Sequence, residues 1–210
     1  GKELVFGQHA RVGQGVQQGG LAGVGVADDG DHGQIATGAL AASLGKRDMV
    51  TVKALALAPS NGVEMGHSSW DGSHTLTSRL AAERAFREAG ITKPAQQVDL
   101  MEVHDCFSIT ELVLMEDPGF SQPGRAVHDI LDGRYDRTGA IPCQTDGGLK
   151  CFGHPVGASG LRMAYEIYTQ LLGRAGERQL ATPSIGLTHN LGGIPNRNVA
   201  SVSVLGLHRG

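Results

Sequence analysis

Residues 146–160 read Asp-Gly-Gly-Leu-Lys-Cys-Phe-Gly-His-Pro-Val-Gly-Ala-Ser-Gly. Gly147 and Gly148 allow backbone conformations and close approaches that a side chain would forbid. His154 lies between a glycine and a proline, which is typical of a turn. The sequence behind it predicts a helix that opens near Ala158. This stretch therefore predicts a histidine held at the mouth of a helix, where the surrounding glycines leave room for a substrate beside the backbone.

The predicted helix after this turn has one apolar stripe. Its members recur at helical spacing and are Leu161, Ala164, Tyr165, Tyr168, Leu171 and Leu172. We expect this stripe to face the core and to fix the position of His154, and we expect the helix to end at Gly173 or Gly176. A lone turn histidine is more often a residue that satisfies backbone groups. The glycines on both sides favour a functional site here.

Composition and length describe an ordinary globular chain. The 210 residues carry a formal net charge of −3 and 40% hydrophobic residues, and no basic run suggests a nucleic-acid partner. No apolar run approaches the ~18 residues of a membrane span, and the N-terminal sequence lacks the apolar core of a signal peptide. Three cysteines, an odd number, argue against a disulfide framework and for a reducing compartment. We therefore expect a cytoplasmic protein.

The chain divides into two parts. Residues 1–48 contain twelve glycines, and Phe6 is their only aromatic residue. This segment matches neither the dinucleotide-binding fingerprint nor the calcium-loop pattern. A short helix over Ile35–Leu44 is expected because the sequence there is rich in alanine. Residues 49–210 form one domain, whereas residues 1–48 stay unassigned.

The sequence pattern of residues 49–210 predicts strands that alternate with helices. The expected strands are Val50–Ala58, Val98–Val103, Ile185–His189 and Val199–Leu205. The expected helices are Thr75–Ala89, one that Ser108 caps with Glu111 at the capping-box position, one near Val127–Leu131, and the helix from Ala158. Residues 190–198 are expected to form the loop between the last two strands. The pattern predicts an α/β fold with one mixed sheet covered by helices on both faces.

Two reactive side chains follow the strand expected over residues 98–103. His104 and Cys106 are two residues apart, so an extended backbone would point both to one side. An imidazolium beside a thiol favours the thiolate. Most free cysteines are buried hydrophobic residues instead. Because α/β sheets place their sites at strand ends, the position favours a catalytic pair.

Other chemistry has weaker support. A zinc site would draw on Cys106, Cys143, Cys151 and His154, but the spacing lacks the usual close cysteine pairs. A serine hydrolase would need a Gly-x-Ser-x-Gly elbow, which the sequence lacks. We therefore expect no metal, and we interpret Cys143 and Cys151 as packing residues.

Three motifs in order resemble the sterol-carrier-type branch of the thiolase superfamily. They are His104-Asp105-Cys106-Phe107, Gly153-His154-Pro155 and His189-Asn190-Leu191-Gly192-Gly193. The resemblance covers about residue 50 to the C-terminus and is to the C-terminal half of such an enzyme, with a thiolase-like half as its fold. It implies an acetyl-CoA acetyltransferase-like acyl-CoA C-acyltransferase of lipid and fatty acid metabolism. The reaction would be thiolytic cleavage of 3-ketoacyl-CoA or the reverse Claisen condensation.

The same resemblance implies roles for individual residues. His154 would help to activate a nucleophilic cysteine and would polarise the thioester oxygen. His104 would contribute to the same oxyanion hole, and Cys106 would move the proton on the α-carbon. Asn190 stands where other thiolases carry a second cysteine in a Cys-x-Gly motif. The backbone N–H of Gly192 would remain as an oxyanion donor.

None of the three cysteines matches the nucleophile that thiolases carry in their first half, which covalent acyl transfer requires. We therefore expect half of an active site, inactive by itself, with the missing N-terminal half as its partner. Residues 1–48 would be a linker, a divergent end of that first half, or a truncation scar. The resemblance also implies an acyl-CoA substrate, no permanently bound cofactor, and a homo-oligomer.

Two alternatives remain open. One is half of a thiolase-like acyl-CoA aldolase, which breaks a carbon–carbon bond without a nucleophilic cysteine. The other is a non-catalytic thiolase-like subunit or lipid-binding module. The sequence decides neither the acyl-chain length nor the direction of the reaction.

Overall fold

The computed structural model describes residues 4–6, 26–28, 31–34, 43, 45, 49–61, 71–194 and 197–207. Strands β2 (Val26–Asp28) and β3 (Asp31–Gln34) form a small antiparallel pair. The helix expected over Ile35–Leu44 falls almost wholly outside the described residues. Apart from this pair and β1 (Leu4–Phe6), which joins the main sheet, the helices and the other strands of the described fold lie within the predicted domain of residues 49–210.

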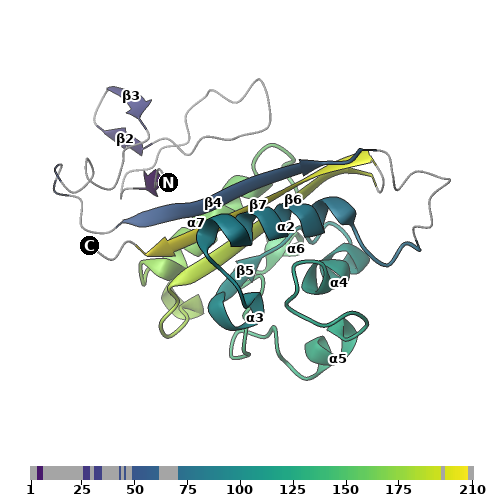
Figure 1. The fold of residues 1–210 in the computed structure, drawn as a ribbon. Coiled ribbons are helices and arrows are strands. Elements are labelled where there is room, and N and C mark those ends of the chain that lie inside the picture. The colour runs from purple at the N-terminus through teal and green to yellow at the C-terminus, as the bar shows by residue number, and fades with distance from the viewer. Residues whose placement is uncertain are drawn as a thin grey trace.

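The main sheet is mixed, as the sequence predicts (Figure 1). Its strands lie in the order β1 (Leu4–Phe6), β4 (Val50–Pro59), β7 (Arg197–Leu207), β6 (Ile185–Ile194) and β5 (Leu100–Glu102). Neighbouring strands are antiparallel except β5 and β6, which are parallel. The carboxyl end of β5 lies opposite Thr188 of β6, and β6 continues in the same direction to Ile194. The carboxyl ends of parallel strands are where α/β proteins place their sites.

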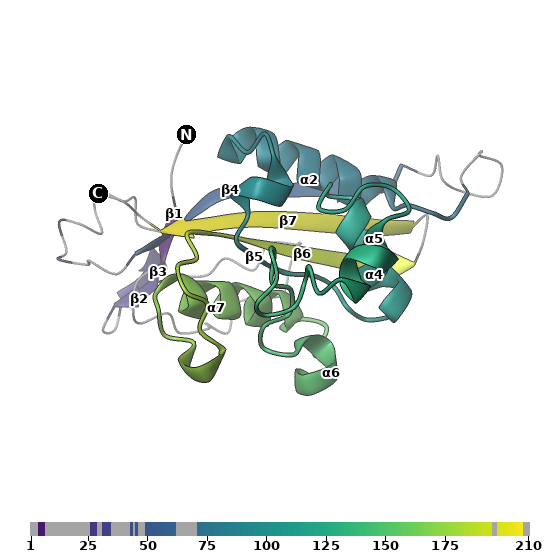
Figure 2. The same ribbon diagram turned by 90° about the horizontal axis from the view of Figure 1, so that it is seen from below.

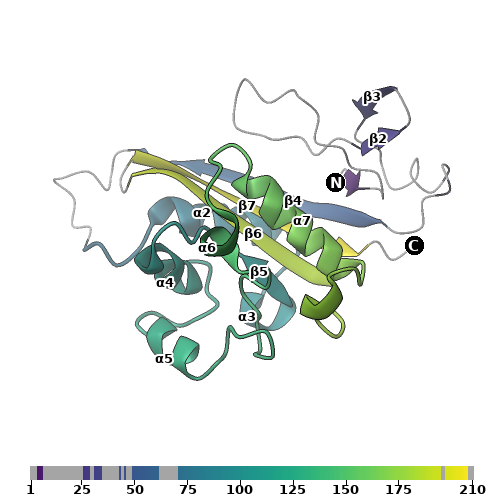
Figure 3. The ribbon, with the colours of Figure 1, turned by 180° about the vertical axis from the view of Figure 1, so that it is seen from behind.

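Helices cover both faces of this sheet (Figure 2). Helix α2 (Leu76–Ala89) packs on β4 and β7. Helix α7 (Ser159–Leu171) lies on the opposite face along β6 and β5 (Figure 3). The remaining helical segments are α3 (Pro94–Gln97), α4 (Ser108–Glu116), α5 (Ala126–Leu131), α6 (Gly148–Phe152) and the 3-10 turn η1 (Gly176–Arg178). The two-faced α/β architecture is confirmed.

Each face has its own apolar core. Between α2 and the sheet, Ala81, Ala82 and Ala85 pack against alternate residues of β4 and β7. Small side chains on both surfaces let the helix approach the sheet closely. Between α7 and the sheet, the smaller core centres on Ile167 and Leu205. The two cores hold α2 and α7 against opposite faces of the sheet.

Helix α4 starts one residue earlier than the capping-box interpretation requires, because that interpretation places Ser108 at the N-cap. Ser108 is its first helical residue, Phe107 is the N-cap, and no side-chain capping hydrogen bond forms. The backbone N–H groups of Thr110 and Glu111 instead donate to the carbonyl of Phe107. The predicted capping box is therefore wrong, because the chain enters the helix through backbone contacts alone.

The prediction of which α7 residues are buried is also wrong in part. Tyr165 is 65% exposed, whereas Met163 and Ile167 are fully buried. The face that turns to the sheet carries the polar residues Glu166 and Gln170 as well, and apolar periodicity cannot detect these. The helix ends at Leu171, and Gly173 adopts a φ of 70° just after it, close to the predicted end.

The last two strands are longer than predicted and form a hairpin. Asn190 pairs with Ser201 and Gly192 with Val199, so both lie in β6 and not in a loop. Asn and Gly are poor strand formers, but a full ladder of cross-strand pairing overrides that local preference. The predicted 190–198 loop is therefore wrong, and only residues 195–196 separate the two strands.

Candidate functional site

The end of β5 and the turn before α7 bring two predicted site residues together. His104 follows the carboxyl end of β5, and His154 precedes α7. Their ring centroids are 5.1 Å apart, with an interplanar angle of 64°. Fifty residues separate them in sequence, so the sheet and α7 create this pair.

His154 is exposed and is held through one ring nitrogen. Its Nδ1 lies 2.8 Å from Oγ of Ser159, and that oxygen lies 3.3 Å from the carbonyl oxygen of Pro155. A carbonyl only accepts, so the Ser159 hydroxyl donates to Pro155 and accepts from Nδ1–H of His154. This favours the neutral tautomer in which Nε2 carries the lone pair. The exposed imidazole can then accept a proton from a ligand.

His104 is buried and is neutral at neutral pH. Its residue is 7% exposed, and its Nδ1 has no hydrogen-bond partner in the described structure. Burial lowers the pKa of His104, the nearby His154 lowers it further, and Asp105 opposes both effects. The sequence analysis expected an imidazolium that would stabilise a thiolate at Cys106. That expectation is wrong at His104, because a desolvated imidazole stays uncharged.

Cys106 is half-buried at the start of the α4 region. The hydrogen bond of its thiol goes to Oγ1 of Thr110, with the two atoms 3.7 Å apart. Thr110 lies in the first turn of α4, so this contact orients the cysteine toward that helix. All three cysteines of the chain are free.

Asp105 links two of the motifs, and the sequence analysis did not single it out. Both of its carboxylate oxygens accept from the backbone N–H of Leu149, at 3.1 and 2.9 Å. Gly148 adopts a φ of 64°, and a Cβ there would collide with the Asp105 carboxylate. Gly147 has a φ of 96°, and its Cβ would collide with the sulfur of Cys151. The two glycines therefore make room for Asp105 and Cys151, whereas the sequence predicted room for a substrate beside them.

The third motif is divided between the two faces of the sheet. His189 is fully buried, and its Nε2 lies 2.9 Å from Oγ of Ser78 on α2. Burial, with a smaller effect from His104, lowers the pKa of His189 to about 3. Asn190 points the other way, because a Cβ added to Gly160 on α7 would be 3.2 Å from its Nδ2. Gly192 is exposed in β6.

A cavity of about 380 Å³ lies at the opposite end of the parallel pair. Its lining includes Asp99, which precedes β5, and Thr182 and Pro183, which precede β6. Asp99 is already satisfied by Ser184 and Ile185, so the cavity offers no unpaired carboxylate there. Among the described residues, no group of three or more His, Cys, Asp or Glu side chains is arranged to hold a metal ion. No described helix has the length and apolar character that crossing a membrane requires.

The fold is that of a thiolase-like domain. A solved structure of an Ltp2–ChsH2(DUF35) aldolase has the same fold, with a TM-score of 0.64 and 21% identity. It matches 78% of this chain and 41% of that chain. At this identity the likeness concerns the fold alone.

The family model "Thiolase C-terminal domain-like" matches residues 61–206, so the chain belongs to this family and the predicted resemblance is confirmed. The acetyl-CoA acetyltransferase of Methanothermobacter thermautotrophicus is 39% identical over 169 residues, which are 78% of this chain and 44% of the relative. Sterol carrier protein 2 of Gallus gallus is 42% identical over 116 residues, which are 54% of this chain and 20% of the relative. The chain thus spans less than half the length of these relatives.

Proposed function

We propose that this chain supplies the acid/base and oxyanion groups of a thiolase-type acyl-CoA C-acyltransferase. The reaction is thiolytic cleavage of 3-ketoacyl-CoA or the reverse Claisen condensation, with coenzyme A and acyl-CoA as substrates. The supporting observation is the histidine pair, with ring centroids 5.1 Å apart, beside the sheet edge where β5 ends. Family membership and the acetyltransferase relatives agree with this chemistry.

In this proposal His154 transfers a proton and then donates a hydrogen bond. Its Nδ1 is held by Ser159, so Nε2 accepts a proton from a thiol. The resulting Nε2–H then donates to the thioester oxygen as negative charge develops there. His104 supplies a second hydrogen-bond donor to the same oxygen, through an N–H group of its neutral imidazole. A fixed donor in a buried site stabilises an oxyanion more than the same donor in water.

Cys106 is the proposed acid/base for the α-carbon, with the backbone N–H of Gly192 and the amide of Asn190 as further substrate contacts. The covalent step requires a nucleophilic cysteine from outside these 210 residues, on a thiolase first half. We propose that half as the partner of this chain, within a homo-oligomer in the cytoplasm. No permanently bound cofactor takes part.

Exchange of the α-protons of acetyl-CoA tests the proposal without the nucleophile. The 210-residue chain is incubated with acetyl-CoA in D₂O, alone and mixed with the first half of the Methanothermobacter acetyltransferase, and deuterium uptake is followed by mass spectrometry. Cys106→Ala should lower the exchange rate by ~10²–10⁴-fold, as loss of a general acid/base does. Cys151→Ala is the matched control and should keep the wild-type rate.

Thiolysis of acetoacetyl-CoA is measured in parallel and should appear only in the mixture. Carbon–carbon cleavage that persists when the first half has no reactive cysteine would instead favour the aldolase. If neither sample exchanges α-protons, the non-catalytic module becomes the better description.

A further inference from the structure

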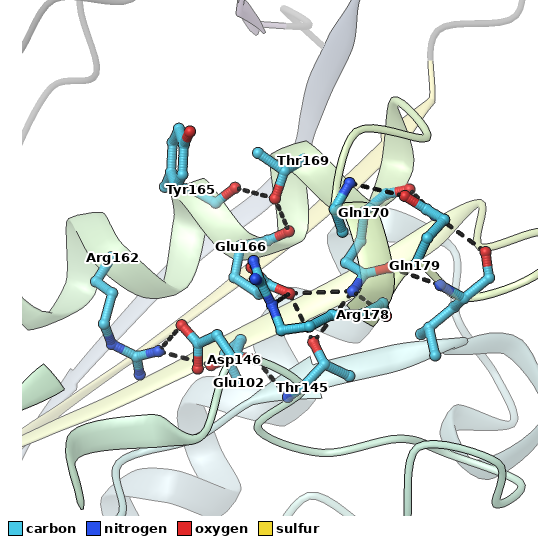
Figure 4. A network of polar contacts seen from close by, with 12 residues as sticks. Glu102, Thr145, Asp146, Arg162, Tyr165, Glu166, Thr169, Gln170, Arg178 and Gln179 are labelled. Atoms are coloured by element: carbon cyan, nitrogen blue, oxygen red, sulfur yellow. Dashed lines mark hydrogen bonds and ion pairs between the residues drawn. The ribbon is translucent and has the colours of Figure 1, made fainter. Parts of the chain in front are cut away.

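Arg162 joins two buried carboxylates at one end of a network of polar contacts (Figure 4). One nitrogen of its guanidinium, Nη1, donates to Oε2 of Glu102 at 3.1 Å and also to Oδ2 of Asp146. The side chains of Arg162, Glu102 and Asp146 are 13%, 0% and 3% exposed. The three residues come from α7, from β5 and from the segment before α6, so one guanidinium joins three separate parts of the chain.

Each partner of Arg162 is directly connected to a site element. Glu102 is the last residue of β5 and lies two residues before His104, and its Oε1 accepts from the N–H of Thr145 at 3.1 Å. Asp146 precedes the glycine pair, and its Oδ1 accepts from the N–H of Gly148 at 2.9 Å. These contacts tie the end of β5 to the glycine segment.

Arg162 is also connected to the His154 turn from two sides. It follows Ser159, whose hydroxyl holds His154, by one helical turn of α7. Its guanidinium carbon lies 5.6 Å from the ring centroid of Phe152, two residues before His154. A guanidinium over an aromatic face is attracted by the ring. Both segments that carry the histidines therefore meet at this one side chain.

The network also contains a further buried carboxylate that has its own cation. Glu166 lies on the same helix and pairs with Arg178 at 2.9 Å, and it accepts from Thr145 and Gln170. Burial and the neighbouring Asp146 and Glu166 raise the pKa of Glu102, while Arg162 opposes this. Buried ion pairs add little net stability compared with apolar packing, yet breaking one is costly. Such a network is better suited to fixing geometry than to stabilising the fold.

We propose that Arg162 is a positioning residue that holds the end of β5 and the turn before α7 at the separation the histidine pair requires. This inference rests on the proposed function of that pair. Arg162 itself does not touch the substrate. It acts through Glu102, Asp146 and Phe152, which carry the constraint to the two histidines.

The test uses the full 210-residue chain with three substitutions. Arg162→Met removes both ion pairs, and Arg162→Lys keeps a positive charge but loses the planar guanidinium that lies over the Phe152 ring. Arg79→Met is the matched control, because Arg79 pairs with the buried Asp117 at 2.7 Å, and both belong to the α2–α4 side of the fold. Unfolding stability, the NMR titrations of the two histidines, and α-proton exchange of acetyl-CoA are measured for each variant.

Arg162→Met should raise the pKa of His104 toward its ordinary value, because a wider separation weakens the part of the lowering that comes from His154. It should also slow exchange by about 100-fold, the effect of a misplacement of about 1 Å. Arg162→Lys should also raise the pKa of His104 and slow the exchange, but by less than Arg162→Met does, with a loss of about tenfold in the exchange rate. Arg79→Met should lower stability and leave both readouts unchanged.

A folded Arg162→Met chain with wild-type histidine titrations and exchange would overturn the inference. If that variant does not fold, Arg162→Lys decides by the same criteria. If the wild-type chain shows no exchange at all, the proposed function fails, and the histidine titrations still decide whether Arg162 sets their separation.

Discussion

Replacing Gly148 by alanine tests whether the contact between the first two motifs is as tight as the geometry indicates. Gly148 has a φ of 64°, where an L-residue costs about 1–2 kcal/mol. Its new Cβ would also collide with the Asp105 carboxylate, which must move and give up its bonds to Leu149 N–H. Loss of a charge-assisted hydrogen bond costs about 1.5–3 kcal/mol. The free energy of unfolding should therefore fall by about 3–5 kcal/mol in total.

The assay is urea unfolding followed by circular dichroism, with Gly119→Ala as the control. Gly119 has a φ of 83°, but a Cβ at this position would meet no atom within 4 Å, so this variant carries only the backbone cost. Adding Asp105→Ala to Gly148→Ala removes the colliding group, so the double variant should lose less stability than the two single losses added together. A Gly148→Ala loss no larger than that of Gly119→Ala would refute the reasoning.

Four further outcomes are expected. Iodoacetamide should label Cys143 far more slowly than the exposed Cys151, because burial and nearby carboxylates raise the pKa of Cys143; equal rates by mass spectrometry would contradict this. His154→Ala should abolish acyl transfer in the mixture with the first half yet leave the melting temperature near wild type, since its side chain is exposed, and an unfolded variant would show a structural role instead. The unfolded state binds a proton at His189 below about pH 6.5 and the folded state only below about 3, so stability should fall as the pH drops through that window, by up to about 5 kcal/mol. His189→Gln should flatten this dependence in acid unfolding curves, and an unchanged curve would assign the effect to other groups. The 210-residue chain alone should show no thiolysis, because it lacks the nucleophilic cysteine. It should also associate in light scattering, because large apolar side chains are exposed beside the site. Robust turnover by a monomer would overturn both expectations.

Large apolar side chains are exposed along the segments of the first two motifs. They include Phe107 at 70%, Ile109 at 62%, Phe152 at 56%, Val156 at 84% and Tyr165 at 65% exposure. All of them belong to the segments that carry or flank the His104 and His154 motifs. Large apolar side chains exposed in such numbers are typical of a surface that another protein covers. This agrees with the proposal that a first half packs on this side of the domain.

Local sequence determined which elements form and where several of them end. The alternation in Val50–Pro59 predicts β4 because every second side chain enters the α2 core. Gly90 ends α2 in the left-handed conformation that glycine adopts without strain. The Gly-His-Pro turn is likewise local, since proline and glycine restrict the backbone on both sides of His154. These features depend only on neighbours in the chain.

Tertiary structure decided the polar features of the site. The buried face of α7 includes Glu166 because Arg178 and Thr145 pair with it, and those partners are distant in sequence. The neutral state of His104 follows from burial, which no motif encodes. Asn190 lies in a strand because β7 pairs with it. A polar side chain takes its charge, orientation and partners from neighbours across space, whereas periodicity reports only which residues are apolar and how the backbone turns.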